Sequence, residues 1–579
     1  MSRSLRSGRW FDGHDVPGLL HRSALRAQGF SVSAGEGQPI IGICNSWSEL
    51  VNCNVHLRAL GAAVKRGVSA AGGVPLEFNT VSLGEQLMKP TTMLYRNLMA
   101  MDVEECLRSY PLDAVVLLGG CDKTIPAQLL GAASADVPAI ALSGGPATPA
   151  VFRERAVSVG TDLWRYTDQL RAGQITQADY DDFEAAAGPS PGHCPEMGTA
   201  STMAALLEGL GMALPGSACV PAMDARRLQV AEATGARAVA VAREALRPSA
   251  ILTEDALHNA ITLLMGIGGS VNAIVHLLAL AGRIGVELPL RRFDEVARRT
   301  PAIVDVQPVG GHLVEQLFHG GGIPAVLAEL RPLLREDALT ITGHTLGAAL
   351  RPKRPDAAVI RSLQDPVRPA GGVAVLHGSL APDGAVIKPS VAEPALLEHE
   401  GKALVFEDID DVAARIDDPD LAAEPGTVMV LRNTGPRGGP GMPEWGQLPI
   451  PQKLLRAGVR DMLRISDARM SGTAFGAVVL HVAPEAAVGG PLGLVRDGDR
   501  IAVSVRERRI DLLVDEEELG CRRQSWRPPP AAYRRGYGAL YLEHVLQADQ
   551  GCDFDFLRGR SAHPESEPRG VLRGMIGGW

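Results

Sequence analysis

Short runs of consecutive hydrophobic residues alternate with longer amphipathic stretches in the N-terminal part of the chain. The runs include "PIIGIC" (39–44), "AVVLLGG" (114–120) and "VPAIALSGG" (137–145), and the segment 91–110 between two of them has helical character. Unbroken apolar runs of this length are typical of strands that are buried on both faces. Their alternation with helices predicts an α/β fold in which helices cover a parallel sheet.

The pattern changes twice further along the chain. Between about 200 and 290 it becomes mainly helical, and apolar residues recur near every 3.6 positions in 199–214 and 272–285. After residues 361–372 it turns into short β-type runs that Gly, Pro and Asp separate. These runs are "GVAVLHGSL" (372–380), "GTVMVLRN" (426–433), "AVVLHVAP" (477–484), "RIAVSV" (500–505) and "RIDLLVD" (509–515). We therefore expect an α/β domain over residues 1–368 and a mostly β, barrel-like domain over 369–579.

Composition and charge narrow the class of protein. The chain has 579 residues, of which 46% are hydrophobic and 21% charged, and its formal net charge is −9. Arginines are scattered and form no basic stripe, so we expect a small-molecule partner and no nucleic acid. The N-terminus lacks an apolar signal segment and no uncharged run reaches the roughly 18 residues that span a bilayer. We expect a cytoplasmic protein that has no membrane partner.

Eight cysteines are spread thinly along the chain, and three of them share a setting. Cys53, Cys121 and Cys194 each lie in a loop rich in Gly, Pro or Asn just before an expected helix, where the helix dipole favours a thiolate. Such loops can converge at one edge of a parallel sheet. Their separations do not match compact ferredoxin motifs. The residues alone therefore leave open a shared metal site or buried, unreactive thiols, with Cys44 as a competing candidate.

Carboxylates in loops indicate a hard cation. Glu85, Asp122 and Glu444 all lie in expected loops, and Mg²⁺ prefers a few carboxylates together with water and substrate oxygens. Taken singly, a carboxylate in such a loop is more often a solvated side chain or a helix cap than a metal ligand. Asp122 is the strongest of the three candidates because it follows Cys121 directly.

Two further loops could contribute to a site. The glycine-rich stretch 432–446 matches no nucleotide-binding motif, so we interpret it as backbone that approaches an active centre closely. The stretch "ISDARMSGTAFG" (465–476) places Ser471 and Thr473 in a turn that does not fit G-x-S-x-G. Ser471 could be a base or proton donor, or an ordinary turn residue. His56 and His193 adjoin cysteine loops, but the residue pairs of zinc sites are absent.

Six collinear stretches carry a family resemblance. They are "GICNSWSELVNCNVHLR", "VSLGEQLMKPTTMLYRNLMAMDVEE", "GGCDKTIPA", "GHCPEMGTASTMAALLEGLGMALPG", "LRNTGPRGGPGMPEWG" and "ISDARMSGTAFG". The sequence resembles the iron–sulfur dehydratases, which include dihydroxy-acid dehydratase, 6-phosphogluconate dehydratase and the sugar-acid dehydratases. The resemblance implies a hydro-lyase with an N-terminal α/β domain and a C-terminal β-barrel domain.

The resemblance also implies roles for individual residues. The thiolates that hold the family's iron–sulfur cluster fall on Cys53, Cys121 and Cys194. The family's Mg²⁺ ligands fall on Glu85, Asp122, Lys123 and Glu444, with the lysine carbamylated in family members. The catalytic serine falls on Ser471, and Thr473 takes a neighbouring site position.

The branch of the family follows from shorter stretches. "LMKPTTMLYRN" (87–97) and "PGMPEWGQLPIP" (440–451) resemble the sugar-acid branch, which usually carries a [2Fe–2S] cluster. Asn52, Glu196 and the stretch 308–322 depart from the family pattern, which affects the expected substrate more than the reaction. We expect dehydration of an aldonate to a 2-keto-3-deoxy acid by a homodimer or homotetramer. The alternatives are a branched-chain dihydroxy-acid dehydratase and a non-catalytic iron–sulfur homologue.

Overall fold

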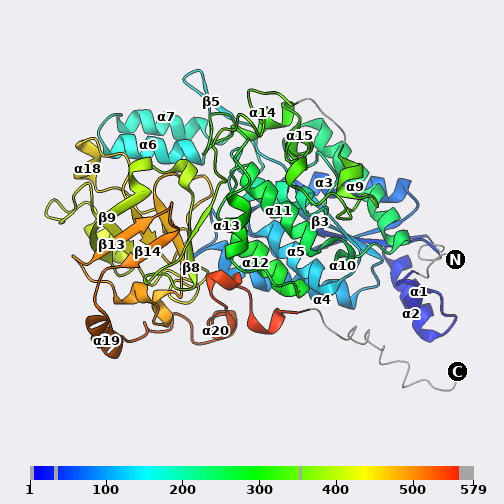
Figure 1. The fold of residues 1–579 in the computed structure, drawn as a ribbon. Helices are drawn as coiled ribbons and strands as arrows, with labels where there is room; N and C mark the ends of the chain where they lie inside the picture. Colours follow the sequence, from blue (N-terminus) through cyan, green and yellow to red (C-terminus); the bar gives the residue numbers. More distant parts are fainter. Residues whose placement is uncertain (1–4, 32–36, 351–354, 560–579) are drawn as a thin grey trace.

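The computed structural model describes residues 5–31, 37–350 and 355–559, and its strands form two main sheets that lie side by side (Figure 1). The first sheet is parallel throughout and has the order β2-β1-β3-β4. Its strands are β1 (Ile40–Asn45), β2 (Val74–Asn79), β3 (Ala114–Gly119) and β4 (Ala139–Ser143). The three hydrophobic runs quoted from the sequence are β1, β3 and β4, so the predicted parallel sheet is confirmed.

Helices cover the first sheet and explain its uniformly apolar strands. Helix α3 (Leu57–Ala70) packs against α9 (Ala225–Glu244), while α4 (Arg96–Ser109) packs against α5 (Thr124–Ala135). Every residue of β1, β3 and β4 is buried. A strand that has helices on both faces needs apolar side chains at every position, which is the pattern in the sequence.

Each strand of the first sheet is followed by a loop that carries candidate site residues. Because the strands are parallel, all four loops leave the same edge of the sheet, where α/β folds bind ligands. In strand order β1 to β4, the loops contain Cys53, Glu85, Cys121 to Lys123, and Cys194. The three cysteines precede helices α3, α5 and α8 (Thr199–Gly209), as predicted.

Two buried helices complete the core behind this edge. Helix α11 (Glu254–Gly266) packs on α8, and α12 (Asn272–Ile284) packs on α5. Almost all residues of α8 and α12 are buried, and the two helices match the segments predicted at 199–214 and 272–285. Within the described residues, no helix combines the length and hydrophobicity that crossing a bilayer requires.

The second sheet has eight strands that curl into a near barrel. Strands β9 to β12 pair in parallel, the other pairings are antiparallel, and the strand order is β14-β13-β9-β10-β11-β12-β8-β7. His377, just after β7, donates its N–H to Arg508 O (3.0 Å) and accepts from Ile510 N–H (3.1 Å), which joins the two edges. The strands are β7 (Ala374–Leu376), β8 (Gly384–Ile387), β9 (Glu398–Phe406), β10 (Val428–Leu431), β11 (Arg464–Ser466), β12 (Val478–Ala483), β13 (Arg500–Ser504) and β14 (Arg509–Leu512).

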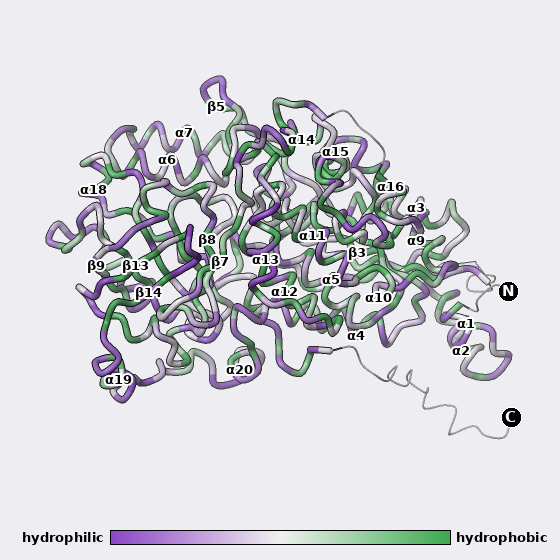
Figure 2. The backbone as a smooth tube through the Cα atoms, viewed as in Figure 1, coloured by the Kyte–Doolittle hydropathy of each residue, from purple (hydrophilic) through white to green (hydrophobic). Residues whose placement is uncertain are grey.

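The expected fold class, an α/β part followed by a mostly β, barrel-like part, is confirmed. The division at 368/369 stays a prediction. Side chains that point into the barrel form one hydrophobic core, whereas Val375, Val386 and Val478 on its outer face join the core of the first part. Figure 2 shows hydrophobic residues concentrated inside both parts, and hydrophilic ones on outlying segments such as α19 (Glu516–Ser525).

The C-terminal segment crosses back to the first part. After α20 (Gly536–His544), the backbone carbonyls of Gly551 and Cys552 accept hydrogen bonds from Arg96 Nη2 at 2.9 and 2.8 Å. Asp553 accepts from Nε and Nη2 of Arg283 at 2.8 and 2.9 Å. Both arginines are almost completely buried, and this segment supplies part of their hydrogen bonds, beside those of Arg96 with Asn97 and of Arg283 with Glu104.

An insertion between β4 and Cys194 lies at the junction of the two parts. It contains the hairpin β5 (Ala150–Phe152) and β6 (Arg155–Val157) and the helices α6 (Thr161–Arg171) and α7 (Gln177–Ala186). The sequence patterns did not predict these elements. In Figure 1 the two helices lie above the barrel, and Thr161 Oγ1 donates to Thr473 O (2.9 Å) on the barrel side.

Candidate active site

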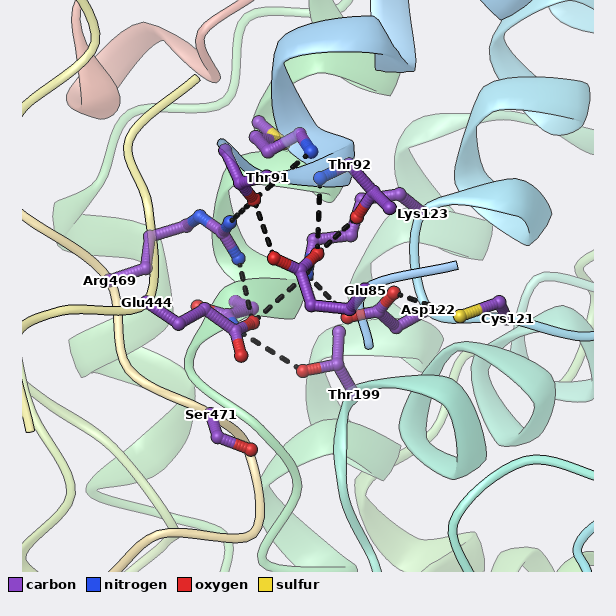
Figure 3. Close-up of polar contacts among 12 residues, drawn as sticks. Glu85, Thr91, Thr92, Cys121, Asp122, Lys123, Thr199, Glu444, Arg469 and Ser471 are labelled. Atoms are coloured by element: carbon purple, nitrogen blue, oxygen red, sulfur yellow. Dashed lines mark hydrogen bonds and ion pairs between the residues drawn. The ribbon is translucent and has the colours of Figure 1, made fainter. Parts of the chain in front are cut away.

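Three carboxylates converge at the junction of the two parts. One oxygen from each of Glu85, Asp122 and Glu444 lies within 4.8 Å of one from each of the others. The Lys123 ammonium lies among them: Nζ is 2.9 Å from Glu444 Oε1, 3.3 Å from Glu85 Oε2, and also pairs with Asp122 (Figure 3). The sequence prediction that these four residues belong together agrees with this geometry, although their role as metal ligands stays a prediction.

The carboxylates of this site are offset by the positive charges of Lys123 and Arg469. This balance of charge tests whether the residues fit Mg²⁺. Burial alone would raise the pKa of Glu85, but Lys123 and Arg469 hold it at about 2. Burial and Arg469 act to lower the pKa of Lys123, but the carboxylates raise it above its ordinary value. Three carboxylates that meet in one partly buried pocket are a donor set that suits a hard divalent cation. The residues therefore fit Mg²⁺.

Threonines fix the orientation of Glu85. Thr91 Oγ1 donates to Glu85 Oε1 (2.7 Å), while the backbone N–H of Thr92 (3.3 Å) and its hydroxyl donate to Oε2. Arg469 in turn donates from Nη2 to Thr91 Oγ1 (3.1 Å). Supporting hydrogen bonds of this kind hold a ligand side chain in place before a metal arrives.

Glu444 is held by two residues that sequence reasoning missed. Arg469 is fully buried and donates from Nη1 to Glu444 Oε1 (3.0 Å) and from Nε to Met442 O (2.7 Å). The Asn272 amide donates to Glu444 Oε1 (3.1 Å) and to Met470 O (2.9 Å). Asn272 therefore ties the carboxylate site to the residue that precedes Ser471. Arg469 lies within the quoted "DARMSG" stretch, so the motif contained a signal for it, whereas nothing marked Asn272.

Two of the three candidate cluster cysteines lie side by side, and the third is near enough to interact electrostatically with one of them. Cys53 and Cys121 are buried in one small hydrophobic cluster with Val51, and a hydrogen bond with Cys53, together with burial, raises the pKa of Cys121 well above its ordinary value. The pKa of Cys194 is raised by burial first, and then by Glu196 and Cys53. Two thiols with raised pKa values beside a third, buried cysteine fit an iron centre, because iron stabilises thiolates, although the three sulfur atoms do not all lie within 4.8 Å of one another.

The competing cysteine and the histidines do not join the thiols. Cys44 lies inside β1, where it contacts Gln128 Nε2 (3.6 Å). His56 Nε2 is 2.9 Å from Gly144 O, and burial lowers the pKa of His193 to about 3. Among the described residues, Glu85, Asp122 and Glu444 are the one set of three or more His, Cys, Asp or Glu side chains whose ligand atoms meet this closely. The zinc alternative gains no support.

Ser471 and Thr473 form a turn beside the carboxylates. Their hydroxyl oxygens are 2.8 Å apart, and Ser471 is partly exposed while Thr473 is buried. Gly472 lets the turn approach the first part of the molecule, because a Cβ atom there would lie 2.6 Å from Thr199 N and 2.7 Å from Ser270 Oγ. The turn thus brings a hydroxyl pair from the barrel to the edge of the parallel sheet.

The glycine-rich loop before Glu444 approaches the site as predicted. Gly441 has a φ of +89°, and a Cβ there would lie 2.6 Å from Leu94 N and 2.7 Å from Thr91 Cγ2. Only glycine fits both the conformation and the contact. This close approach places Met442 and Glu444 beside the threonines that hold Glu85.

Comparison with known proteins identifies the family of this site. The model of the dihydroxy-acid/6-phosphogluconate dehydratase N-terminal domain matches residues 38–349, and that of the C-terminal domain matches 358–552. The chain belongs to the dihydroxy-acid/6-phosphogluconate dehydratase family. Membership makes the protein a hydro-lyase, as the resemblance implied, and dehydratases of this family generally use an iron–sulfur cluster and Mg²⁺.

Relatives cover nearly the whole chain. An L-arabonate dehydratase of Azospirillum brasilense is 50% identical over 96% of this chain and 97% of its own length. A 6-deoxy-6-sulfo-D-gluconate dehydratase of Pseudomonas putida is 45% identical over 97% of this chain and 98% of its own. A dihydroxy-acid dehydratase of Ignicoccus hospitalis is 42% identical over 93% and 98%, respectively. The two relatives that act on sugar acids are thus more similar to this chain than this dihydroxy-acid dehydratase is.

Proposed function

We propose that the protein dehydrates a sugar acid, an aldonate, to a 2-keto-3-deoxy acid. The observation that carries the proposal is the direct succession of Cys121, Asp122 and Lys123, which puts one thiol of the cysteine group next to the carboxylate group. One small substrate could reach both groups at once. The greater similarity to the two sugar-acid dehydratases supports an aldonate over a branched-chain acid.

The residues we propose for the cofactors are those that the resemblance named. Cys53, Cys121 and Cys194 would hold a [2Fe–2S] cluster, and Glu85, Asp122, Glu444 and a carbamylated Lys123 would hold Mg²⁺. When bound, these groups supply Lewis acidity toward the developing negative charge and the departing hydroxyl. Carbamylation would turn the Lys123 cation, which pairs with three carboxylates, into a fourth anionic oxygen ligand.

Ser471 would take the proton from C2 of the substrate. A serine hydroxyl is a weak base near neutral pH, so its oxygen needs nearby cations and a hydrogen-bond donor. Thr473 Oγ1 at 2.8 Å can donate to it, and Arg469, two residues before Ser471, supplies a buried positive charge. Both hydroxyls come from one turn, so their spacing is fixed before substrate arrives.

Unpaired polar atoms around this turn also favour a polyhydroxylated substrate. Asn272 and Gln447 donate their amide protons to the backbone of the turn region, at Met470 O and Phe475 O. Their side-chain oxygens, Asn272 Oδ1 and Gln447 Oε1, are buried and have no hydrogen-bond partner in the part of the chain that the structure describes. A sugar acid carries hydroxyls that could donate hydrogen bonds to these amide oxygens, whereas a branched-chain acid presents methyl groups, which cannot donate.

A substrate panel tests the proposal. Anaerobically purified protein with Mg²⁺ would be assayed for 2-keto acid on L-arabinonate, xylonate, galactonate, gluconate, fuconate and 2,3-dihydroxyisovalerate. We expect strong turnover of one or two aldonates. Turnover of 2,3-dihydroxyisovalerate alone would assign the protein to the branched-chain alternative, and no turnover by cluster-loaded protein would support the non-catalytic one. The homodimer or homotetramer and the cytoplasmic location stay predictions.

A further inference from the structure

Glu196 is a buried carboxylate that no step of the proposed reaction uses. It lies two residues after Cys194, and its side chain is fully buried. Its Oε1 accepts the backbone N–H of Thr161 (2.7 Å), at the start of α6. Its Oε2 is buried and has no hydrogen-bond partner among the described residues. An unpaired buried carboxylate oxygen is costly, which indicates that something absent from the chain itself binds there.

Contacts place Glu196 beside the Ser471–Thr473 turn. A Cβ atom on Gly160 would lie 2.1 Å from Glu196 Oε1 and 2.6 Å from Thr473 Cγ2, so both side chains border the same glycine. A Cβ on Gly198 would lie 2.9 Å from Thr473 Cγ2. Glu196 is also close enough to Cys194 to raise the pKa of that thiol. Glu196 therefore lies between the proposed cluster and the proposed catalytic turn.

The hydroxyl of Ser158, which lies near Glu196, does not supply a hydrogen bond to Glu196 Oε2. The Ser158 side chain interacts with Glu196 and acts to lower the pKa of that carboxyl, against the larger effect of burial, but no Ser158 atom makes a hydrogen bond to Oε2. The Ser158 hydroxyl donates to Asp162 Oδ2 (3.4 Å), and its backbone N–H donates to the same oxygen (2.9 Å). The hydrogen bonds that Ser158 donates are therefore made to Asp162.

We propose that Glu196 Oε2 binds a hydroxyl of the sugar acid beyond C3, which makes Glu196 a specificity-determining residue. The inference rests on the proposed function. Glu444, Ser471, Thr473 and Glu196 follow one another along the junction, so a substrate whose carboxylate lies at the Glu85–Asp122–Glu444 site extends its tail toward Glu196. A hydroxyl on the tail of the substrate can donate a hydrogen bond to Glu196 Oε2. A methyl or methylene group at that place leaves the oxygen buried without a hydrogen bond. Glu196 is also a position at which this sequence departs from the family pattern.

The test measures kcat/KM on two substrates that differ in their tail hydroxyls. L-arabinonate, or the aldonate of the panel that is turned over fastest, is compared with 2,3-dihydroxybutanoate, which has no hydroxyl beyond C3. We expect the wild-type enzyme to prefer the aldonate by about 10- to 100-fold, the range that one hydrogen bond to a buried charged group gives. Glu196→Thr should reduce this preference to a few-fold, and Glu196→Gln, which retains one acceptor oxygen, should give an intermediate value.

Thr161→Val is the matched control. It removes the hydrogen bond from α6 to Thr473 O but leaves the Glu196 carboxylate in place, so it should lower kcat/KM by the same factor on both substrates. Equal losses on both substrates in the Glu196 variants would show that Glu196 only supports α6, and the inference would be wrong. Cluster absorbance of each variant verifies that the site is intact.

A binding measurement separates this inference from the proposed function. Calorimetry would measure the Kd of the aldonate for the Ser471→Ala variant and for the Ser471→Ala/Glu196→Gln double variant. The measurement requires binding only, so neither variant has to convert the substrate. We expect binding that is weakened about 10-fold in the double variant. An unchanged Kd would overturn the inference alone, whereas wild-type enzyme that is inactive on every aldonate would overturn the proposed function.

Discussion

The two parts of the molecule supply the site from similar positions but with different chemistry. In the first part, the loops after β1 to β4 carry thiols, two carboxylates and a lysine. In the barrel, the loops after the parallel strands β10 and β11 carry Glu444, Arg469 and the Ser471–Thr473 turn. Both sets leave the carboxyl ends of parallel strands, which are the usual position for ligand sites. One part thus provides most of the candidate metal ligands, and the other provides the candidate proton-transfer group.

This division implies that cofactor binding and proton transfer can be disrupted separately. Of the four candidate metal ligands, Glu444 is the one that comes from the barrel, and it meets Lys123, Arg469 and Asn272. Variants of the candidate ligands in the first part should therefore lose a cofactor. A variant at the Ser471–Thr473 turn should keep both cofactors. A variant at Glu444 should affect the carboxylate site and also its contacts with the barrel.

The largest effect is expected for Cys121→Ser. A serine hydroxyl is a poor iron ligand, so the variant should lose most of the visible absorbance of the cluster and all measurable turnover. Iron content and the absorbance spectrum of anaerobically purified protein are the measurements. Cys44→Ser, in a neighbouring strand, serves as the control and should keep its iron. Full iron content in Cys121→Ser would remove Cys121 from the ligand set.

Ser471→Ala should abolish turnover while the other half of the site stays intact. Loss of a general base lowers kcat by about 10²- to 10⁴-fold, and alanine at this partly exposed position leaves the fold unchanged. Cluster absorbance and Mg²⁺ binding should match those of the wild-type enzyme. If kcat stayed near its wild-type value, the base would have to be another group.

Glu444→Gln should weaken Mg²⁺ binding by about 10- to 100-fold, because the site loses a negative charge while neighbouring hydrogen bonds remain possible. The Mg²⁺ concentration that restores activity after EDTA treatment measures this effect, and in the wild-type enzyme EDTA should inactivate and Mg²⁺ should restore. Cluster absorbance should not change. Activity that is indifferent to chelation would contradict a Mg²⁺ site at these carboxylates.

The smallest effect concerns the stability of the barrel. Burial, assisted by Arg469, lowers the pKa of His481 in β12 from 6.5 to about 3. The unfolded chain therefore takes up a proton below pH 6.5 that the folded protein does not, so stability is lost as the pH falls from 6.5 toward 3. Relative to His481→Gln, the wild-type free energy of unfolding should drop by about 2 kcal/mol more between pH 7 and pH 5. Parallel pH profiles from urea titrations would contradict this.

The sequence predicted the first part of the fold better than the barrel. Strands β1, β3 and β4 are apolar at every position because helices cover both faces. Strand β9 (Glu398–Phe406) was missed because its first half is charged and largely exposed, and only its second half is buried. Strand β11 has three residues, too few for a periodic pattern. Burial on both faces therefore leaves a clearer signal than burial on one.

The candidate site was predicted from motifs, and its supporting residues were not. The nine predicted site residues lie in loops at the junction of the two parts, but their roles stay predictions. Asn272 donates to Glu444 across 172 residues of sequence, and Arg469 to Thr91 across 378. Contacts over such separations depend on how the two parts assemble, which local patterns do not contain. Glu196 departs from the pattern that the resemblance implies, but the sequence does not reveal its contact with α6.

The return of the C-terminal segment to the first part affects how the chain is made. Arg96 finds its carbonyl acceptor 455 residues later in the sequence, and Arg283 finds Asp553 270 residues later. During synthesis, the N-terminal half therefore leaves the ribosome with two arginines that lack part of their buried hydrogen bonds: Arg96 can already pair with Asn97, and Arg283 with Glu104, but the acceptors at 551–553 do not yet exist. A nascent chain stalled before residue 551 should therefore be less stable in its N-terminal half than the complete chain.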